Sequence, residues 1–299
     1  MEMLMPRHAS QAWRTHGRDT MNRTPKVAAV QDLSGLGRCS LSVILPVLSV
    51  MGTQCCPLPT AVLSAHTAFP APEAAAFQDL TGAMEQTLDH WEALHVTFDA
   101  IYSGFLGSLQ QIALLRRLIQ QFRQKETLVL IDPVMGDHGR VYRTYTQEMC
   151  EQTALLAAEA DLITPNLTEA ALLLGEPFDR IPTTQAGIEA WLQRLSLDGK
   201  RSVVITGVSL APKTLGAGCL DGAGGKIRFA MARQEPGQFF GTGDLFAAVL
   251  LGSLLRGEAL SEATARAVDF IQKAVARTLT AGTPMLEGVQ FEPLLQELV

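Results

Sequence analysis

This sequence lacks three features: long apolar runs, an excess of positive charge and cysteines at metal-ligand spacing. No apolar stretch reaches the roughly 18 residues that a membrane-spanning helix needs. The formal net charge is −6, so no global positive field exists to bind nucleic acid or an anionic membrane. The five cysteines are odd in number and lack C-x-x-C or Cys/His spacing. We therefore expect a cytoplasmic protein with reduced thiols that binds neither nucleic acid nor membrane.

The signatures of several enzyme classes are also missing. Gly225-Lys226 is followed by Ile227, so no G-x-x-x-x-G-K-[ST] P-loop occurs here. The H-R-D and D-F-G motifs of protein kinases and the G-x-S-x-G elbow of serine hydrolases are absent as well. Gly35 and Gly37 give a near match to a dinucleotide-binding fingerprint, but it ends in Ser40, and no acid follows about 20 residues later. A Rossmann dehydrogenase is therefore disfavoured.

Short apolar runs that alternate with helix-period segments make up most of the chain, which indicates a parallel sheet covered by helices. We expect a single domain over residues 26–299, because α/β folds of this size often remain one unit. Residues 1–25 are expected to be a disordered leader or an overextended start. The expected strands are Val27–Val30, Cys55–Leu63, Ala100–Tyr102, Leu128–Ile131, Leu162–Ile163 and Val203–Ile205.

Apolar stripes at helical spacing predict three helices that pack on this sheet, at residues 41–48, 112–122 and 188–195. The segment Leu245–Leu255 is apolar nearly all round, so we expect a helix buried on every side. Near it in the sequence, Thr214–Leu220 and Lys226–Ala232 flank a glycine-rich turn and predict an antiparallel hairpin at the sheet edge.

The segment Gly241-Thr242-Gly243-Asp244 opens the buried helix and carries the strongest chemical signal. Glycines allow close backbone approach to a ligand, and the free N–H groups of a helix's first turn attract anions. An Asp in the same turn can accept the proton of an attacking hydroxyl. The alternative is a glycine turn in which Thr242 is the N-cap and Asp244 a favourable first-turn acid.

Two other acids follow predicted strands, where ligands of open α/β sheets bind. Asp132 opens D-P-V-M-G-D and suits an indirect magnesium ligand, although Asp-Pro also favours a turn. Glu169 ends T-P-N-L-T-E, where it can form a capping box with Asn166, lie near nucleotide phosphates through magnesium and water, or do both. After the second strand, Thr60 and His66 are candidate contacts for a polar ring, but a lone histidine is more often structural.

Four segments occur in an order that resembles the pyridoxal/pyridoxamine kinase family of the ribokinase superfamily: Tyr102–Ser108, Asp132–Gly136, Thr164–Glu169 and Gly241–Asp244. The resemblance runs from about residue 26 to about residue 292. It implies an α/β, ribokinase-like three-layer sandwich in which helices flank a mostly parallel central sheet. It also implies a homodimer.

The resemblance further implies transfer of the ATP γ-phosphoryl group to the 5′-hydroxyl of a vitamin B6 vitamer. Asp244 would be the base, beside an anion hole formed by the backbone of Gly241, Thr242 and Gly243. The remaining roles fall to two sets of residues. Asp132 and Glu169 would organise Mg²⁺ and the ATP phosphates, with Thr164, Thr206 and Gly243 along the nucleotide, while Asp32, Thr60, Phe105 and His66 would border the vitamer ring.

Position 32 departs from many pyridoxal kinases, in which a serine meets the pyridine ring. The Asp32 carboxylate would favour a protonated ring nitrogen or an amine-bearing vitamer such as pyridoxamine. Two alternatives stay open. Hydroxymethylpyrimidine kinases share the D-P-V-M and T-P-N-x-x-E segments, although many carry Cys at the position of Asp244 and a D-P-[ST]-G-G first loop. A non-catalytic vitamer-binding regulator is the other alternative, although a pure binder needs no base.

Overall fold

The computed structural model describes residues 23–222 and 224–299, so the expected leader lies almost wholly outside the described residues. In the described part, nine strands form one sheet in the order β11-β10-β9-β8-β5-β4-β1-β2-β3, and β6 and β7 form a separate two-stranded hairpin. The strands are β1 Lys26–Ser34, β2 Gln54–Leu63, β3 Phe77–Asp79, β4 Ala100–Ser103, β5 Leu128–Ile131, β6 Gly136–Asp137, β7 Arg140–Val141, β8 Leu162–Ile163, β9 Ser202–Val208, β10 Thr214–Leu220 and β11 Arg228–Arg233.

The six neighbouring strands from β2 to β9 in this order are parallel, and the three at the margins, β3, β10 and β11, pair antiparallel. All six predicted strands and the predicted hairpin are present. β1 is longer than expected: it continues past its apolar run through Gln31 and Asp32, because β2 pairs with it as far as Ser34.

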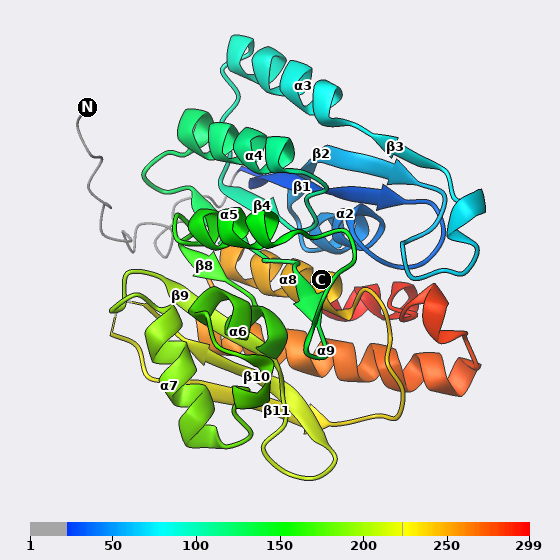
Figure 1. Ribbon diagram of the computed structural model, residues 1–299, viewed down its shortest axis with the longest axis vertical. Helices are drawn as coiled ribbons and strands as arrows, with labels where there is room; N and C mark the ends of the chain where they lie inside the picture. The colour runs from blue at the N-terminus through cyan, green and yellow to red at the C-terminus, as the bar shows by residue number, and fades with distance from the viewer. Residues whose placement is uncertain (1–22, 223) are drawn as a thin grey trace.

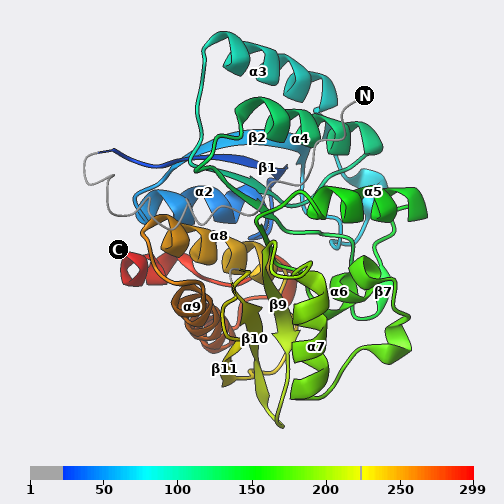
Figure 2. The ribbon, with the colours of Figure 1, turned by 90° about the vertical axis from the view of Figure 1, so that its left-hand side faces the viewer.

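Helices cover both faces of the sheet (Figures 1 and 2). The α-helices are α2 Leu41–Val50, α3 Thr81–Ala93, α4 Leu109–Phe122, α5 Gln147–Ala157, α6 Leu167–Leu174, α7 Gln185–Leu195, α8 Thr242–Leu255 and α9 Leu260–Ala281, with short 3₁₀ turns at Pro72–Ala74, Phe178–Arg180, Met285–Glu287 and Glu292–Leu298. In the described part of the chain, no helix is long and apolar enough to cross a membrane.

Alternation along each strand divides the core between two faces. Val27 and Ala29 of β1 pack in a cluster with α2, α8 and α9, whereas Ala28 and Val30 pack in a second cluster with α3 to α7. Side chains on a strand point alternately to opposite faces, so one apolar run supplies both clusters. The predicted three-layer α/β sandwich with a mostly parallel sheet is confirmed.

Helix α8 is the most deeply buried helix of its layer. Every residue from Leu245 to Leu255 is buried, and the helix packs against both α2 and α9. At Gly252 an added Cβ would lie 2.4 Å from the Met51 sulfur, so α8 approaches the end of α2 closely. The predicted all-round burial is confirmed, and it holds the start of α8 firmly at the sheet edge.

Candidate active site

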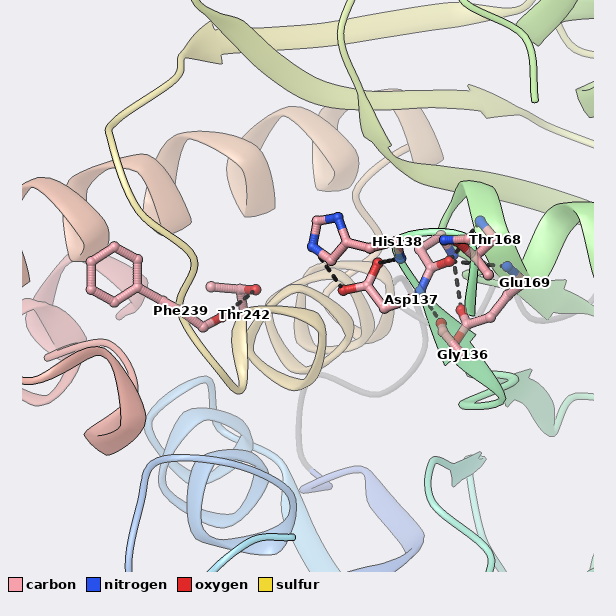
Figure 3. A network of polar contacts seen from close by, with 9 residues as sticks. Gly136, Asp137, His138, Thr168, Glu169, Phe239 and Thr242 are labelled. Atoms are coloured by element: carbon pink, nitrogen blue, oxygen red, sulfur yellow. Dashed lines mark hydrogen bonds and ion pairs between the residues drawn. The ribbon is translucent and has the colours of Figure 1, made fainter. Parts of the chain in front are cut away.

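The first turn of α8 lies at the edge where the parallel strands end. Gly241 precedes the helix with φ 74°, and an added Cβ would lie 1.9 Å from the Arg38 carbonyl oxygen, so only glycine fits. Thr242 is the first helical residue, and its hydroxyl donates to the Phe239 carbonyl at 3.2 Å (Figure 3). The alternative expectation that Thr242 caps the helix is therefore wrong, because Gly241 is at the N-cap.

The start of α8 is open to an anion. Among the described residues, no side chain caps this helix, so its first N–H groups are left for another acceptor. Gly243 in the same turn faces open space, because an added Cβ there would meet no described atom within 4 Å. This combination of free donors and room suits a phosphoryl group.

Asp244 lies in this turn with both carboxylate oxygens bound. The Gln31 side-chain amide donates to one oxygen, and the Ser40 backbone N–H donates to the other at 2.7 Å. Burial raises the pKa of Asp244 to about 6, and the Asp32 charge adds to the rise, while the Ser40 and Gln31 donors oppose it. Asp244 is therefore ionised at neutral pH yet more basic than an ordinary aspartate, as a general base requires.

Asp32 is buried at the end of β1 and is linked to Asp244 through Ser40. The Ser34 hydroxyl donates to one Asp32 oxygen at 2.9 Å, and the Ser40 hydroxyl donates to the other at 2.6 Å. Ser40 has φ 53° and ψ −138°, a conformation that non-glycine residues rarely adopt. This strained backbone directs the Ser40 N–H to Asp244 while its hydroxyl reaches Asp32.

Asp132 follows β5 and is also buried. Burial raises the pKa of Asp132 to about 8, the Asp244 charge adds to the rise, and the neighbouring Thr164 hydroxyl opposes it. Thr164 follows β8, the next strand of the sheet. The structure thus brings Asp132, Thr164 and Asp244 into one site, from three separate elements.

Glu169 is buried in the first turn of α6 and accepts two backbone hydrogen bonds, from Asn166 at 2.9 Å and from Met135 at 3.2 Å (Figure 3). The Asn166 side chain accepts in return from the N–H groups of Thr168 and Glu169, which completes the predicted capping box. Burial raises the pKa of Glu169 well above its usual range, and the Asp132 charge adds to the rise. The carboxylate is therefore structural and also close to the acidic site.

The remaining predicted site residues lie around this centre with backbone partners. The Thr60 hydroxyl donates to the Phe105 carbonyl at 3.3 Å, which joins β2 to the loop after β4. Thr206 of β9 donates its N–H to the Pro165 carbonyl at 2.9 Å. These contacts place Thr60 and Phe105 together and Thr206 beside the segment that follows β8.

His66 has a partner for each ring nitrogen. Its Nδ1 accepts from the Ala68 N–H at 3.3 Å, so Nε2 carries the proton and donates to the Leu286 carbonyl at 2.7 Å. The ring also stacks on Phe240, with 4.8 Å between ring centroids. These contacts give His66 a structural role between two loops, and a substrate contact by His66 remains a prediction.

Sequence reasoning missed three residues of the site. Ser40 enters the sequence analysis only as the end of a near match to a dinucleotide-binding fingerprint, and Gln31 receives no role there, although both hold Asp244. Tyr142 lies partly exposed beside the acids. Burial raises the pKa of its phenol and the charges of Glu169, Asp137 and Asp132 add to the rise. The only signal for Tyr142 in the sequence was its position shortly after the D-P-V-M-G-D segment.

No direct cage for a metal is formed by these residues. In the described ranges, no group of three or more His, Cys, Asp or Glu side chains could hold a metal ion. Asp132 and Glu169 nevertheless lie close enough for the charge of one to raise the pKa of the other. Two buried acids with oxygen ligands fit a cation that keeps most of its water shell, as magnesium does.

Comparison with known proteins gives matches over most of the chain. The sequence matches the family described as phosphomethylpyrimidine kinase over residues 59–287, which include Asp132, Glu169 and Asp244. It is 33% identical to a pyridoxal kinase of Pasteurella multocida over 201 residues, 63% of this chain and 67% of that protein.

Solved structures match more completely. A Bacteroides thetaiotaomicron protein assigned as a phosphomethylpyrimidine kinase, in a crystal form with pyridoxal, has a TM-score of 0.86 at 40% identity. The alignment covers 92% of this chain and 96% of that one. The pyridoxal kinase of Lactobacillus plantarum has a TM-score of 0.83 at 34% identity, over 92% of this chain and 97% of that one.

Proposed function

The chain belongs to the phosphomethylpyrimidine kinase family of the ribokinase superfamily, and from this premise we propose that it phosphorylates the 5′-hydroxyl of a vitamin B6 vitamer with ATP. The observation that carries the proposal is Asp244, a buried carboxylate held in the uncapped first turn of α8. Two further observations favour a vitamer over a pyrimidine. The curated relative is named a pyridoxal kinase, and the 40% identical structure was crystallised with pyridoxal.

In this mechanism Asp244 accepts the proton as the vitamer hydroxyl attacks the γ-phosphorus. A new bond forms between the 5′-oxygen and phosphorus, the bond from phosphorus to the bridging oxygen breaks, and ADP leaves with that electron pair. The N–H groups at the start of α8 stabilise the charge on the migrating phosphoryl oxygens. Gly241 and Gly243 keep side chains out of that space.

Magnesium is part of this proposal. Asp132 and Glu169 would hold it through water, where it would screen the negative charge of the ATP phosphates. Such an ion would also offset the Asp132 charge, which adds to the effect of burial in raising the pKa of Glu169. Thr164 and Thr206 would lie along the nucleotide, as their positions after and within neighbouring strands allow.

The vitamer ring would lie near Asp32, Thr60 and Phe105. Asp32 is a carboxylate whose oxygens accept hydroxyl hydrogen bonds from Ser34 and Ser40, so it keeps acceptor capacity for one more donor. A protonated ring nitrogen or the amine of pyridoxamine would supply that donor. The ranking of vitamers by kcat/KM tests this part of the proposal.

We also propose a homodimer in the cytoplasm. All five cysteines are free, in keeping with a reducing compartment. Leu33 and Val62 are opposite each other in the β1–β2 register, and both are exposed, together with Leu36 in the following loop. These side chains would be covered by a second copy. Light scattering on the wild type and on Val62→Asp tests the assembly, and a wild-type monomer would refute it.

The activity is tested by steady-state phosphorylation with Mg-ATP against pyridoxal, pyridoxamine, pyridoxine and hydroxymethylpyrimidine. Preferred turnover of a vitamer supports the proposal, and preferred turnover of the pyrimidine moves the protein to the other substrate class. Asp244→Asn should lower kcat by roughly 10²- to 10⁴-fold and leave ligand binding intact. Tight vitamer binding by the wild type without turnover would instead indicate a regulatory protein.

A further inference from the structure

Two buried polar side chains of the sheet, Gln31 and Tyr102, lie below Asp244. Gln31 on β1 is 1% exposed, and its amide nitrogen donates to one Asp244 oxygen. The Gln31 side chain lies on the face that α8 covers, because Val27 and Ala29, four and two residues earlier, pack on that same face. The amide therefore reaches Asp244 from the floor of the site, on the sheet below α8.

Gln31 has room for this orientation only because residue 104 is glycine. An added Cβ at Gly104 would lie 2.2 Å from the Gln31 amide nitrogen and 2.6 Å from its carbonyl carbon. Gly104 follows β4, and its N–H donates to the Val30 carbonyl at 3.0 Å, which ties the two strands together at this point. The Gln31 amide thus packs against the backbone at Gly104, just after β4.

The other end of the amide faces Tyr102. The Gln31 carbonyl oxygen and the Tyr102 hydroxyl are both buried, and neither has a hydrogen bond of normal geometry with any described residue. Gln31 is nevertheless among the groups that act on the pKa of Tyr102, which burial raises well above its usual range, so the two side chains face each other. A hydrogen bond from the Tyr102 hydroxyl to the Gln31 carbonyl oxygen would satisfy both buried groups and would keep the amide N–H₂ directed to Asp244.

We propose that Gln31 is a positioning residue for the base, and that Tyr102 fixes the direction of its amide. This inference rests on the proposed function, in which Asp244 accepts the proton. With the Ser40 N–H on the second oxygen, the Gln31 donor prevents the Asp244 carboxylate from rotating. Gln31 adds no charge, so it holds the base without changing the net charge of the acidic site.

Gln31→Met keeps the length of the side chain and removes the donor. We expect kcat to fall roughly 10- to 100-fold, as for loss of one hydrogen bond to a charged group. KM for both substrates should change little, because Gln31 acts on the base. The matched control is Gln272→Met on α9, which removes a glutamine-to-carboxylate hydrogen bond to Glu235 in the loop after β11, and its kcat should equal that of the wild type.

A second readout separates positioning from a merely structural role. Five segments direct titratable or charged groups toward Asp244: Asp32 from β1, Cys39 from the loop before α2, Tyr102 from β4, Asp132 after β5 and Tyr142 after β7. Gln31 opposes the raised pKa of Asp244, so its loss should move the acid limb of kcat to higher pH. An unmoved limb with unchanged kcat in Gln31→Met would overturn the proposal.

Tyr102→Phe tests the inference even if Gln31→Met fails to fold: its kcat should fall severalfold at unchanged KM, and a wild-type kcat would overturn the role of Tyr102. If Gln31→Met folds, the double variant should be no slower than Gln31→Met alone, because Tyr102 acts through Gln31. If the losses of kcat in the two single variants added up in the double variant, Tyr102 would not act through Gln31. A wild type without kinase activity would refute the proposed function itself, and the Gln31 comparison is made only on an active wild type.

Discussion

Turnover should fall as the pH is lowered through about 6, because Asp244 must be ionised to accept a proton. Burial and the Asp32 charge raise its pKa from the ordinary 3.8 to about 6. At pH 5 about one molecule in ten would then hold an ionised base, against more than about nine in ten for an unshifted aspartate. We therefore expect kcat to be roughly tenfold lower near pH 5 than near pH 8.

The same experiment tests whether the Asp32 charge raises or lowers the pKa of Asp244. Asp32→Asn removes a negative charge next to Asp244 and keeps one acceptor oxygen, for either the Ser34 or the Ser40 hydroxyl. Loss of this charge makes the ionised form of Asp244 easier to reach, so its pKa should fall. The acid limb of kcat should move to lower pH in this variant.

The assay is the chromatographic yield of phosphorylated vitamer at saturating Mg-ATP and vitamer, from pH 4.5 to 8.5. Saturation matters because kcat then reports the groups of the complex. ATP affinity over the same range serves as the control for titration of the nucleotide. An acid limb that stays below pH 5 in the wild type, or one that Asp32→Asn moves upward, would refute the reasoning.

Two further predictions concern stability and backbone space. Asp132→Asn should raise the free energy of unfolding by roughly 2–4 kcal/mol near pH 7. The pKa of Asp132 is about 8 in the folded protein, against 3.8 for an ordinary aspartate, so the wild type loses stability as the pH rises from about 4 to 8. The asparagine variant has no such carboxyl group and avoids this loss. Urea titration that shows no gain near pH 7, or an equal gain at pH 4, would contradict this. Gly241→Ala should destabilise the protein by roughly 2 kcal/mol or more, because its Cβ would meet the Arg38 carbonyl oxygen. Gly243→Ala should keep the wild-type melting temperature, because its Cβ would meet no described atom within 4 Å. Its kcat should nevertheless fall at least about tenfold, because the added methyl group would occupy the space of the phosphoryl group. Equal kcat in Gly243→Ala and wild type would argue against the anion hole.

Most of the sheet could be predicted because its central strands are short, fully apolar runs. Leu128–Ile131 and Leu162–Ile163 are buried on both faces, and burial of this kind leaves a clear signal. β3 was missed because all three of its residues, Phe77–Asp79, are exposed and form a margin strand. β6 and β7 have two residues each, too few to show any period.

The acids of the site could be predicted from their places after strands, whereas the groups that hold them could not. Gln31 and Ser40 reach Asp244 across 213 and 204 residues of sequence, and no local pattern encodes such a contact. Their role depends on how β1, α2 and α8 pack together. Ser40 was further hidden because its strained φ arises from tertiary contacts, and a serine at that point signals only a helix start.

The close contact between α2 and α8 connects a site remote from the catalytic residues, at Met51 and Gly252, to the proposed base Asp244. Ser40 and Asp244 lie at the two helix starts, while Met51 and Gly252 meet near the opposite ends. A larger side chain at position 252 would displace Met51 and change the spacing of α2 and α8, and the Ser40–Asp244 hydrogen bond depends on that spacing. Natural or engineered sequence change at this remote point is therefore constrained by the geometry of proton transfer.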